Sequence, residues 1–313
     1  GLSGSDQDEI KKANKESLMD ASFTSSISEE GSKIDISDLN SPSEVLRNST
    51  RTRIKNLFMG RMESEKGFSD RYNESQFDEL IDNMTDFMSR KIEGVKGGDK
   101  YAKYSELNSK ANFNSPPFPP NRAPRTIREL RYVAGMNEEF LQILEPAITI
   151  YGSRAINPNQ ATEAIIKSLD VAITDEVAKA VVARVSNEQE GGPYKTPEDF
   201  WNYLEGKGVK IDEKSKLVPL IFDEVTHFRI AATGTSGRIT KSIDAIAMNF
   251  VTPAKAIRSA FEKEYQKNNP GSPTPTPTPT PTQATGPGGG QTNGQKPEND
   301  TKAPPTIVYW SEH

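Results

Sequence analysis

Two kinds of hydrophobic pattern divide the chain, one typical of strands near its ends and one typical of helices in its middle. Phe23 and Ile27 alternate with polar neighbours, and the alternation returns through Phe228 and Ile230. A period of two is typical of strands with one buried face. A last apolar run, Thr306–Trp310, has strand composition. The pattern therefore predicts one antiparallel sheet from three segments, near 21–39, 226–250 and 306–311.

Gly-containing turns are predicted inside the first two of these segments. Glu29–Ser32 precedes Ile34 and Ile36, which favours a hairpin between residues 21–29 and 34–36. Gly234–Gly237 is the second predicted turn. The answering strand, from Arg238 to Phe250, alternates imperfectly, which indicates a bulge.

Between the strands, apolar residues recur every three or four positions, as in Phe77, Leu80, Ile81 and Met84. That spacing places one apolar stripe on each helix, facing a shared core. The helices predicted in this way cover 42–58, 74–92, 159–169, 174–184 and a stretch from Pro197. A further helix is expected after Thr252-Pro253, with Ile257, Ala260, Phe261 and Tyr265 on one face.

Capping residues set the expected helix starts. Asn159 is predicted to accept bonds from the free N–H groups of the turn that follows it. Thr196, followed by Pro197, is predicted to cap the last of these helices. Thr126 and Glu129 are spaced as a capping box. These side chains are expected to act structurally.

Composition narrows the possible functions. The chain has 313 residues, no Cys, two His, a net charge of −5 and 33% hydrophobic residues. Disulfides and Cys-based metal or redox chemistry are excluded, and catalytic His pairs are not expected. No apolar run approaches the roughly 20 residues that span a bilayer. The acidic balance gives no general attraction to nucleic acid or anionic lipid.

A linker precedes the last predicted strand. Five Pro-Thr repeats and a Gly-rich run fill residues 270–305, a composition that cannot build a core. A flexible chain of that length averages roughly 30 Å from end to end. We therefore expect the tail strand to return to the same sheet.

Two motifs resemble one protein family. The first begins at Tyr151-Gly152, continues through Ile156-Asn157-Pro158-Asn159-Gln160-Ala161 and a helix, and ends in Gly191–Phe200, which reads GGPYKTPEDF. The second is Thr126–Met136, upstream at the matching distance. In this order they are similar to the K-class minor pseudopilins of type II secretion. The resemblance covers most of residues 20–250 and returns at 305–312.

The resemblance implies an α+β fold with an N-terminal helix on an antiparallel sheet and a large all-α domain inserted between strands. The expected divisions are residues 1–41 and 221–313 for the two parts of the pseudopilin domain, with a linker at 268–305, and 42–220 for the inserted domain. Residues 6–20 are predicted to form a short helix, because Ile10, Ala13, Ser17, Leu18 and Ala21 lie near one face. In the family this helix would be the polar end of the long N-terminal helix. A helix this short needs a sheet to lie on.

The function that the resemblance implies is structural and not enzymatic. A K-class subunit sits at the tip of the periplasmic pseudopilus of a Gram-negative bacterium and joins I-class and J-class minor pseudopilins, mainly through its N-terminal helix. Ile10, Ala13, Ser17 and Leu18 are therefore the expected partner-binding residues. Secreted substrates and the outer-membrane channel are further expected contacts. The family carries a leader and an inner-membrane helix upstream of the residues printed here.

The chain departs from the family at a possible calcium run. The family has Asp-Trp-x-Asp-x-Asp, whereas Asp86-Phe87-Met88-Ser89-Arg90 stands here. Calcium needs six to eight oxygen ligands from a formed loop. Asp78, Glu79, Asp82 and Asp86 offer oxygens, but carboxylates at helical spacing are usually solvated. No cofactor is therefore expected, and calcium stays an open alternative.

Three other interpretations of the sequence stay open. Short capped helix pairs resemble the helix-hairpin-helix motif of DNA-binding proteins, yet the second hairpin, Leu169–Ile173, has no Gly, and residues 161–213 hold eleven acids against six bases. A basic ridge could meet phosphate or an acidic partner, or be an ordinary exposed helix side. A hydrolase with paired carboxylates lacks any motif that would pair them. The ridge consists of Arg122, Arg125, Arg128 and Arg131.

Overall fold

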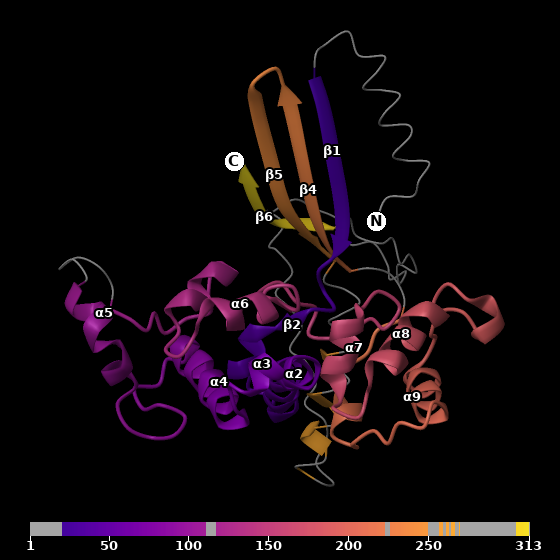
Figure 1. Cartoon of the computed structure of the whole chain (residues 1–313), viewed down its shortest axis with the longest axis horizontal. Coiled ribbons are helices and arrows are strands. Elements are labelled where there is room, and N and C mark those ends of the chain that lie inside the picture. Colours follow the sequence, from indigo (N-terminus) through magenta and orange to yellow (C-terminus); the bar gives the residue numbers. More distant parts are fainter. Residues whose placement is uncertain are drawn as a thin grey trace, which may run out of the picture.

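A four-stranded antiparallel sheet stands on a body of helices (Figure 1). The computed structural model describes residues 21–110, 117–222, 226–249 and 305–312, together with 257–258, 261–262, 264–266 and 269. The helices of the body come from the chain between the first and second strands of this sheet. A mixed helix and antiparallel-sheet fold is thus confirmed, whereas the division at residues 41 and 220 stays a prediction.

The sheet joins distant segments in the order β1-β4-β5-β6. The strands are β1 (Ala21–Glu29), β4 (His227–Ser236), β5 (Ile239–Met248) and β6 (Thr306–Glu312). β1 pairs with β4, and β6 pairs antiparallel with β5. The predicted return of the tail to the sheet is confirmed, so the first and last described strands belong to one four-stranded sheet.

The turn between β4 and β5 lies later than predicted. β4 continues through Gly234 to Ser236, and the chain reverses at Gly237-Arg238. Gly237 has a φ of 58°, which favours glycine, and two-residue turns of this kind fit the twist of paired strands. The predicted irregularity lies between Ile246 and Ala247, but the extra residue, Val308, belongs to the partner strand β6.

The predicted hairpin between residues 21–29 and 34–36 is wrong. Residues 34–35 form β2 (Ile34–Asp35), which pairs in parallel with β3 (Ile148–Thr149) inside the helical body. Ile34 and Ile36 are fully buried there. The burial of these two side chains in the body's core outweighs the local tendency of the Gly31 turn to fold the chain back on β1.

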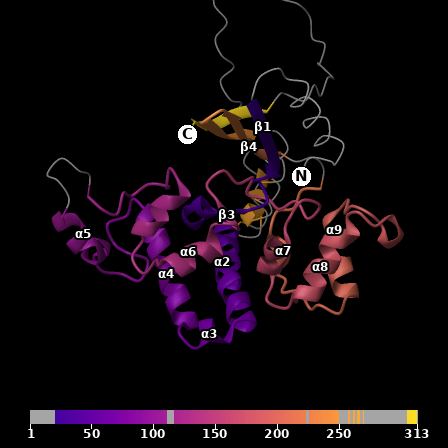
Figure 2. The same cartoon turned by 45° about the horizontal axis from the view of Figure 1, so that its top comes forward.

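The helical body holds eight described α-helices and several short 3-10 helices. The α-helices are α2 (Glu44–Ser64), α3 (Lys66–Ser69), α4 (Glu74–Met88), α5 (Ser105–Lys110), α6 (Glu138–Leu144), α7 (Glu163–Leu169), α8 (Asp175–Arg184) and α9 (Pro197–Gly206). The 3-10 helices are η1 (Ile36–Asn40), η2 (Lys100–Tyr104), η3 (Ile127–Tyr132), η4 (Glu188–Glu190) and η5 (Ser215–Leu217). Figure 2 shows α2 between α4 on one side and α7 on the other.

An aromatic cluster forms the centre of the body. The Phe58 and Phe77 rings stack at 4.7 Å, and the Phe140 ring meets both at steep angles. Phe68 stacks on Phe77, and all four rings are almost fully buried. Aromatic contacts of this geometry add to the free energy gained from burial. The cluster ties together α2, α3, α4 and α6.

Of the three predicted helix caps, one is confirmed and two are wrong. Thr196 caps α9, since its hydroxyl accepts the Asp199 N–H at 3.1 Å. Asn159 does not cap α7, which begins later and is capped by Thr162. The Thr126 side chain makes no capping bond to η3, and Glu129 instead accepts from Arg122 and the Arg125 N–H.

Asn159 instead joins three segments of the body. Its Oδ1 accepts the Tyr194 N–H at 2.8 Å, and its Nδ2 donates to the carbonyls of Tyr194 and Phe222 at 2.9 and 3.0 Å. An amide side chain carries an acceptor oxygen and a nitrogen with two N–H donors, so Asn159 can make all three bonds at once. The loop before α7 is thereby held to the segments that flank α9.

Part of the helix expected after residue 252 is described and is helical at 257–258, 261–262 and 264–266. The Glu264 carboxylate accepts the Glu44 N–H at 2.7 Å and also bonds the Ser43 hydroxyl. It therefore caps α2 together with Ser43, whose own hydroxyl accepts the Leu46 N–H. The segment that follows β5 is thus fixed to the central helix of the body. Thr252 and Pro253 lie outside the described residues.

Candidate partner-binding surface

The sheet has one apolar face. Residues that pair across an antiparallel ladder share a side, so Phe23, Ile27 and their partners form a continuous surface. Four of its large side chains are about half exposed: Phe23 at 47%, Ile27 at 44%, Ile307 at 57% and Trp310 at 52%. The same face also carries Phe228, Ile230, Ala232, Ile239, Ile243, Ala245 and Ala247, together with the polar or charged Ser25, Glu29, Lys241 and Glu312.

The other face of the sheet is mostly polar, apart from the buried Ile246 and Met248. Along β1 it carries Ser22, Thr24, Ser26 and Ser28, and the paired strands continue it with Thr233, Ser242 and an ion pair between Arg229 and Asp244. The Thr233 and Ser242 hydroxyls bond at 2.9 Å. Most of these polar groups are paired within the sheet, although among the described residues the buried Asp244 Oδ1 has no hydrogen-bond partner. The apolar face, by contrast, has exposed side chains that a partner could bury.

Residues Ile10, Ala13, Ser17 and Leu18, the predicted partner-binding residues, lie outside the described part of the chain. Their role stays a prediction. The sequence pattern did indicate the alternation of Phe23, Ile27 and Ile230 along this face. It gave no sign that Trp310 and Ile307 would extend the face, because that depends on the register of β6 against β5.

A buried polar junction joins the sheet to the body. The Glu30 carboxylate accepts from Thr149 Oγ1 at 2.7 Å and from Lys33 Nζ at 2.8 Å. The Gly31 carbonyl accepts from both the N–H and the hydroxyl of Ser153. The Ser32 hydroxyl accepts the Asn157 N–H at 3.0 Å. Because these groups are buried and paired, the junction fixes where the sheet stands on the body.

Several ionisable groups at this junction have displaced pKa values. Burial raises the pKa of Glu29 to about 7, against the lowering effect of the Ser32 N–H bonds. Burial and the neighbouring Asp35 carboxylate raise the pKa of Asp38 to about 7. Burial lowers the pKa of Arg53 to about 9 and that of His227 to about 4. The junction is therefore the part of the chain where pH should act most strongly.

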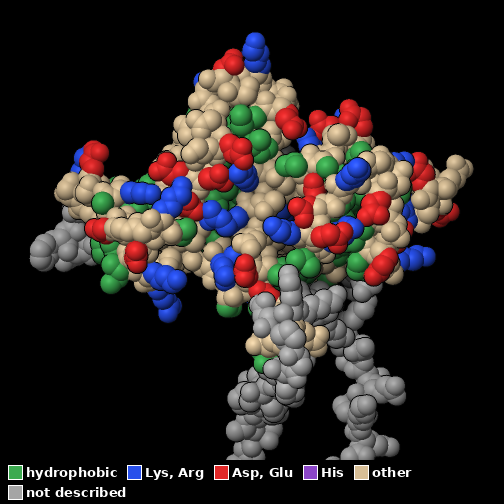
Figure 3. Space-filling model, turned by 90° about the horizontal axis from the view of Figure 1, so that it is seen from below, with side chains coloured by type: hydrophobic (Ala, Val, Ile, Leu, Met, Phe, Trp, Pro, Cys, Tyr) green, Lys and Arg blue, Asp and Glu red, His purple; other side chains and the backbone are tan. Residues whose placement is uncertain are grey.

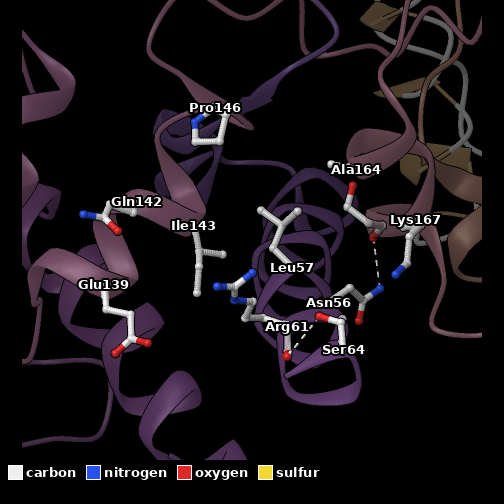
Figure 4. A pocket seen from close by; sticks show the side chains of 12 residues that line it. Asn56, Leu57, Arg61, Ser64, Glu139, Gln142, Ile143, Pro146, Ala164 and Lys167 are labelled. Carbon is white, nitrogen blue, oxygen red and sulfur yellow. Dashed lines mark hydrogen bonds between the residues drawn. The ribbon is translucent and has the colours of Figure 1, made fainter. Parts of the chain in front are cut away.

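A pocket of about 440 Å³ lies between α2, α6 and α7 (Figure 4). Leu57, Ile143 and Pro146 give it an apolar wall. The charged groups at its rim have partners already: Glu139 pairs with Arg71, and Lys167 with Asp175. The pocket therefore offers shape and apolar surface, without a free charge that would select a ligand.

The acidic run of α4 is engaged by protein groups. Asp82 pairs with Arg51 at 2.5 Å and with Lys96 at 3.1 Å. Asp86 Oδ1 accepts the Val95 N–H at 2.8 Å. Within the described ranges, no group of three or more His, Asp or Glu side chains is arranged to hold a metal ion. Lysine and arginine side chains thus occupy positions beside these carboxylates that a cation would need.

The arginine ridge is only partly paired. Arg122 contacts Glu129 at 3.0 Å, and Arg131 lies 3.6 Å from Glu138. Arg125 and Arg128 are exposed. The body's face seen from below mixes acidic and basic side chains (Figure 3), which is typical of a solvated surface.

Both predicted helix hairpins use their backbone amides internally. Asp170 Oδ1 accepts the Ala172 N–H at 3.0 Å in the turn between α7 and α8. The Ala134 N–H bonds the Tyr104 hydroxyl in the turn between η3 and α6. A helix-hairpin-helix site needs such amides free to bind phosphate. In the turn between α7 and α8, the Asp170 carboxylate occupies the place where a phosphate would bind. The hairpins therefore act as structural turns here.

None of the helices that the structure describes is long and apolar enough to cross a membrane.

Comparison with solved structures supports a pseudopilin-like fold. The chain is similar to a chain in the crystal structure of the GspK–GspI–GspJ complex from the type 2 secretion system of enterotoxigenic Escherichia coli. The TM-score is 0.55 at 14% sequence identity, and the match covers 76% of this chain and 78% of that chain. Comparisons of the sequence with family models and with individual characterised proteins find no match. At this identity the likeness shows the fold.

Proposed function

We propose that the chain is a structural subunit of a type II secretion pseudopilus, a minor pseudopilin of the K class that caps the fibre tip. The observation that carries the proposal is the fold: a helical body emerging between β1 and β4 of a small sheet, similar over 76% of the chain to a member of the GspK–GspI–GspJ complex. The two sequence motifs at 126–136 and 151–200 support it independently.

Packing and shape provide the mechanism, and no bond chemistry is required. The N-terminal segment, through Ile10, Ala13, Ser17 and Leu18, would form a helix against the apolar sheet face and against I-class and J-class partners. Such a helix would bury Phe23, Ile27 and Trp310, which the sheet alone leaves about half exposed. The helical body would then block further subunits from stacking above this one.

The polar junction supports this role mechanically. A cap must hold its bulk in a fixed orientation on the fibre, and the buried contacts of Glu30, Ser32 and Ser153 give that rigidity. In this account the native protein is held in the inner membrane by a helix upstream of the printed residues. Its described part then lies in the periplasm, where secreted proteins and the outer-membrane channel are within reach.

Secretion in the source organism tests the proposal. Deleting the gene should abolish export of the type II substrates, which should accumulate in the periplasm, and the full-length gene should restore export. A version that lacks residues 42–220, replaced by a short Gly-Ser linker, should fail to restore normal fibre length if the body caps growth. Normal export without the gene would contradict the proposal.

A further inference from the structure

The two outermost described strands of the sheet differ in length and regularity. β6 has seven residues and its pairing with β5 is interrupted at Val308, whereas both strands end in a glutamate. β1 has nine residues, pairs with β4 without a shift, and carries no charge and no proline from Ala21 to Ser28. Natural sheets usually protect an edge with charges, prolines or bulges. β1 lacks all three over eight residues.

The register identifies which backbone groups of β1 face outward. The Glu30 N–H donates to the His227 carbonyl at 3.0 Å, so the even-numbered residues of β1 exchange hydrogen bonds with β4. The odd-numbered residues therefore turn their N–H and C=O groups away from the sheet. In the described part of the chain, no backbone partner meets these groups of Phe23, Ser25 and Ile27.

The side chains of β1 determine which kind of strand could pair with its outer edge. Phe23 and Ile27 flank Ser25 on the apolar face at 47% and 44% exposure. A strand with apolar residues opposite these two would extend the apolar face sideways and contact the edge of their side chains, beside the surface that the proposed N-terminal helix would cover. No charged side chain between Ala21 and Ser28 offers a counter-charge, so a charged strand would be desolvated without compensation.

We propose that the outer edge of β1 takes up an extended, uncharged segment of a partner subunit as a fifth strand of the sheet. Backbone bonds to Phe23, Ser25 and Ile27 would supply affinity, and apolar residues at alternate positions would supply the match. The proposal rests on the proposed function, because the partner is sought among the I-class and J-class subunits that such a protein would join.

One substitution separates strand addition from folding. Ser25→Pro removes an N–H that the β1–β4 ladder does not use. The sheet should therefore still form, because proline is tolerated in an edge strand where the N–H faces outward. Ser25→Ala keeps the N–H and is the matched control. Binding of the purified I-class and J-class periplasmic domains of the same organism is measured by biolayer interferometry. Ser25→Pro should weaken Kd by at least about tenfold and Ser25→Ala by less than about twofold.

A second pair of variants covers the case in which Ser25→Pro disturbs the sheet. Ser25→Lys places a charge on the apolar face, beside the outer edge of β1. Ser26→Lys places the same charge on the polar face of the sheet, at a residue whose backbone bonds to β4. Only Ser25→Lys should weaken binding. Circular dichroism melting curves of all four variants show which of them fold.

The outcomes distinguish the two proposals. Wild-type chain that does not bind either partner contradicts the proposed function and removes this partner with it. Wild-type binding that Ser25→Pro and Ser25→Lys leave unchanged overturns strand addition alone. Self-association of the wild-type chain that Ser25→Pro abolishes, with partner binding intact, would assign the edge to a second copy and overturn the choice of partner.

Discussion

The sheet and the helical body are stabilised in different ways. The body closes on itself around stacked rings at Phe58, Phe77 and Phe140, which have almost no contact with solvent. The sheet is tied by backbone ladders but leaves Phe23 and Trp310 about half exposed. The apolar side chains of this cluster in the body are buried, whereas the sheet leaves apolar side chains exposed that a partner could bury.

The contrast assigns different roles to the two regions. A surface that is closed and mixed in charge, as on the body, suits a part that gives bulk and orientation. A half-exposed apolar face beside an unprotected strand edge suits assembly. The junction between Glu30, Thr149 and Ser153 then determines whether the two regions behave as one unit.

The largest effect should come from the aromatic cluster. Phe77→Ala removes a ring that stacks on both Phe58 and Phe68, and should lower the free energy of unfolding by about 3–5 kcal/mol. Ile27→Ala, on the half-exposed sheet face, should lower it by less than about 1.5 kcal/mol. Urea unfolding followed by circular dichroism measures both. Equal losses would remove the contrast between the two regions.

A pH series tests the junction. Asp38 has a pKa of about 7 in the fold against an ordinary value of 3.8, so the folded state binds its proton more tightly than the unfolded state. Stability should therefore fall as pH rises from about 4 to about 7, and level off above, with a contribution on the order of 2–4 kcal/mol. Glu29 acts in the same direction, and His227 in the opposite one.

Asp38→Asn isolates this contribution. The variant cannot ionise at this position, so its stability should change less between pH 5 and pH 8 than that of the wild-type chain, and it should be the more stable of the two at pH 8. Denaturant midpoints at each pH give the comparison. A wild-type slope that the variant reproduces would show that Asp38 is not the group responsible.

The three bonds of Asn159 offer a sharper test within the body. Asn159→Ala leaves the Tyr194 N–H and two carbonyls without their partner, and should cost about 1–3 kcal/mol. Gln160→Ala, at the exposed neighbouring position, should have almost no effect. Chemical unfolding of both variants checks this. If Asn159→Ala left the free energy of unfolding unchanged, water would be replacing the three bonds of the amide without loss of stability.

The smallest effect concerns the cap on α2. Glu264→Gln weakens the bonds to the Glu44 N–H and the Ser43 hydroxyl, and should cost about 0.5–1 kcal/mol. Glu262→Gln, on the same segment, is the matched control. Differential scanning calorimetry should show a lower Tm for the first variant alone. Identical Tm values for both variants would mean that the Glu264 cap on α2 does not stabilise the body.

Sequence reasoning predicted the periodic elements well and the long-range contacts poorly. The spacing of Phe77, Leu80 and Ile81 and the Thr196-Pro197 start indicated α4 and α9. The strand composition of Thr306–Trp310 indicated β6. These succeed because a period and a cap are local properties of the chain.

The failures share one physical cause. Ile34 and Ile36 looked like the second arm of a hairpin, but their partner strand, at Ile148–Thr149, lies more than a hundred residues away. Asn159 was predicted as a cap from its local position, but its partners, Tyr194 and Phe222, lie 35 and 63 residues further along the chain. The Glu264 cap on α2 and the open edge of β1 are likewise set by tertiary packing. A single sequence gives local preference without showing which distant group competes with it.

Hydrogen exchange tests the central claim most directly, namely that assembly uses the sheet while the body stays closed. The chain is compared alone and with its I-class and J-class partners, using mass spectrometry at peptide resolution. The account predicts new protection in peptides that cover residues 21–29, with exchange in α2, α4 and α6 unchanged. Protection confined to the helical body, with β1 exchanging as in the free chain, would contradict it.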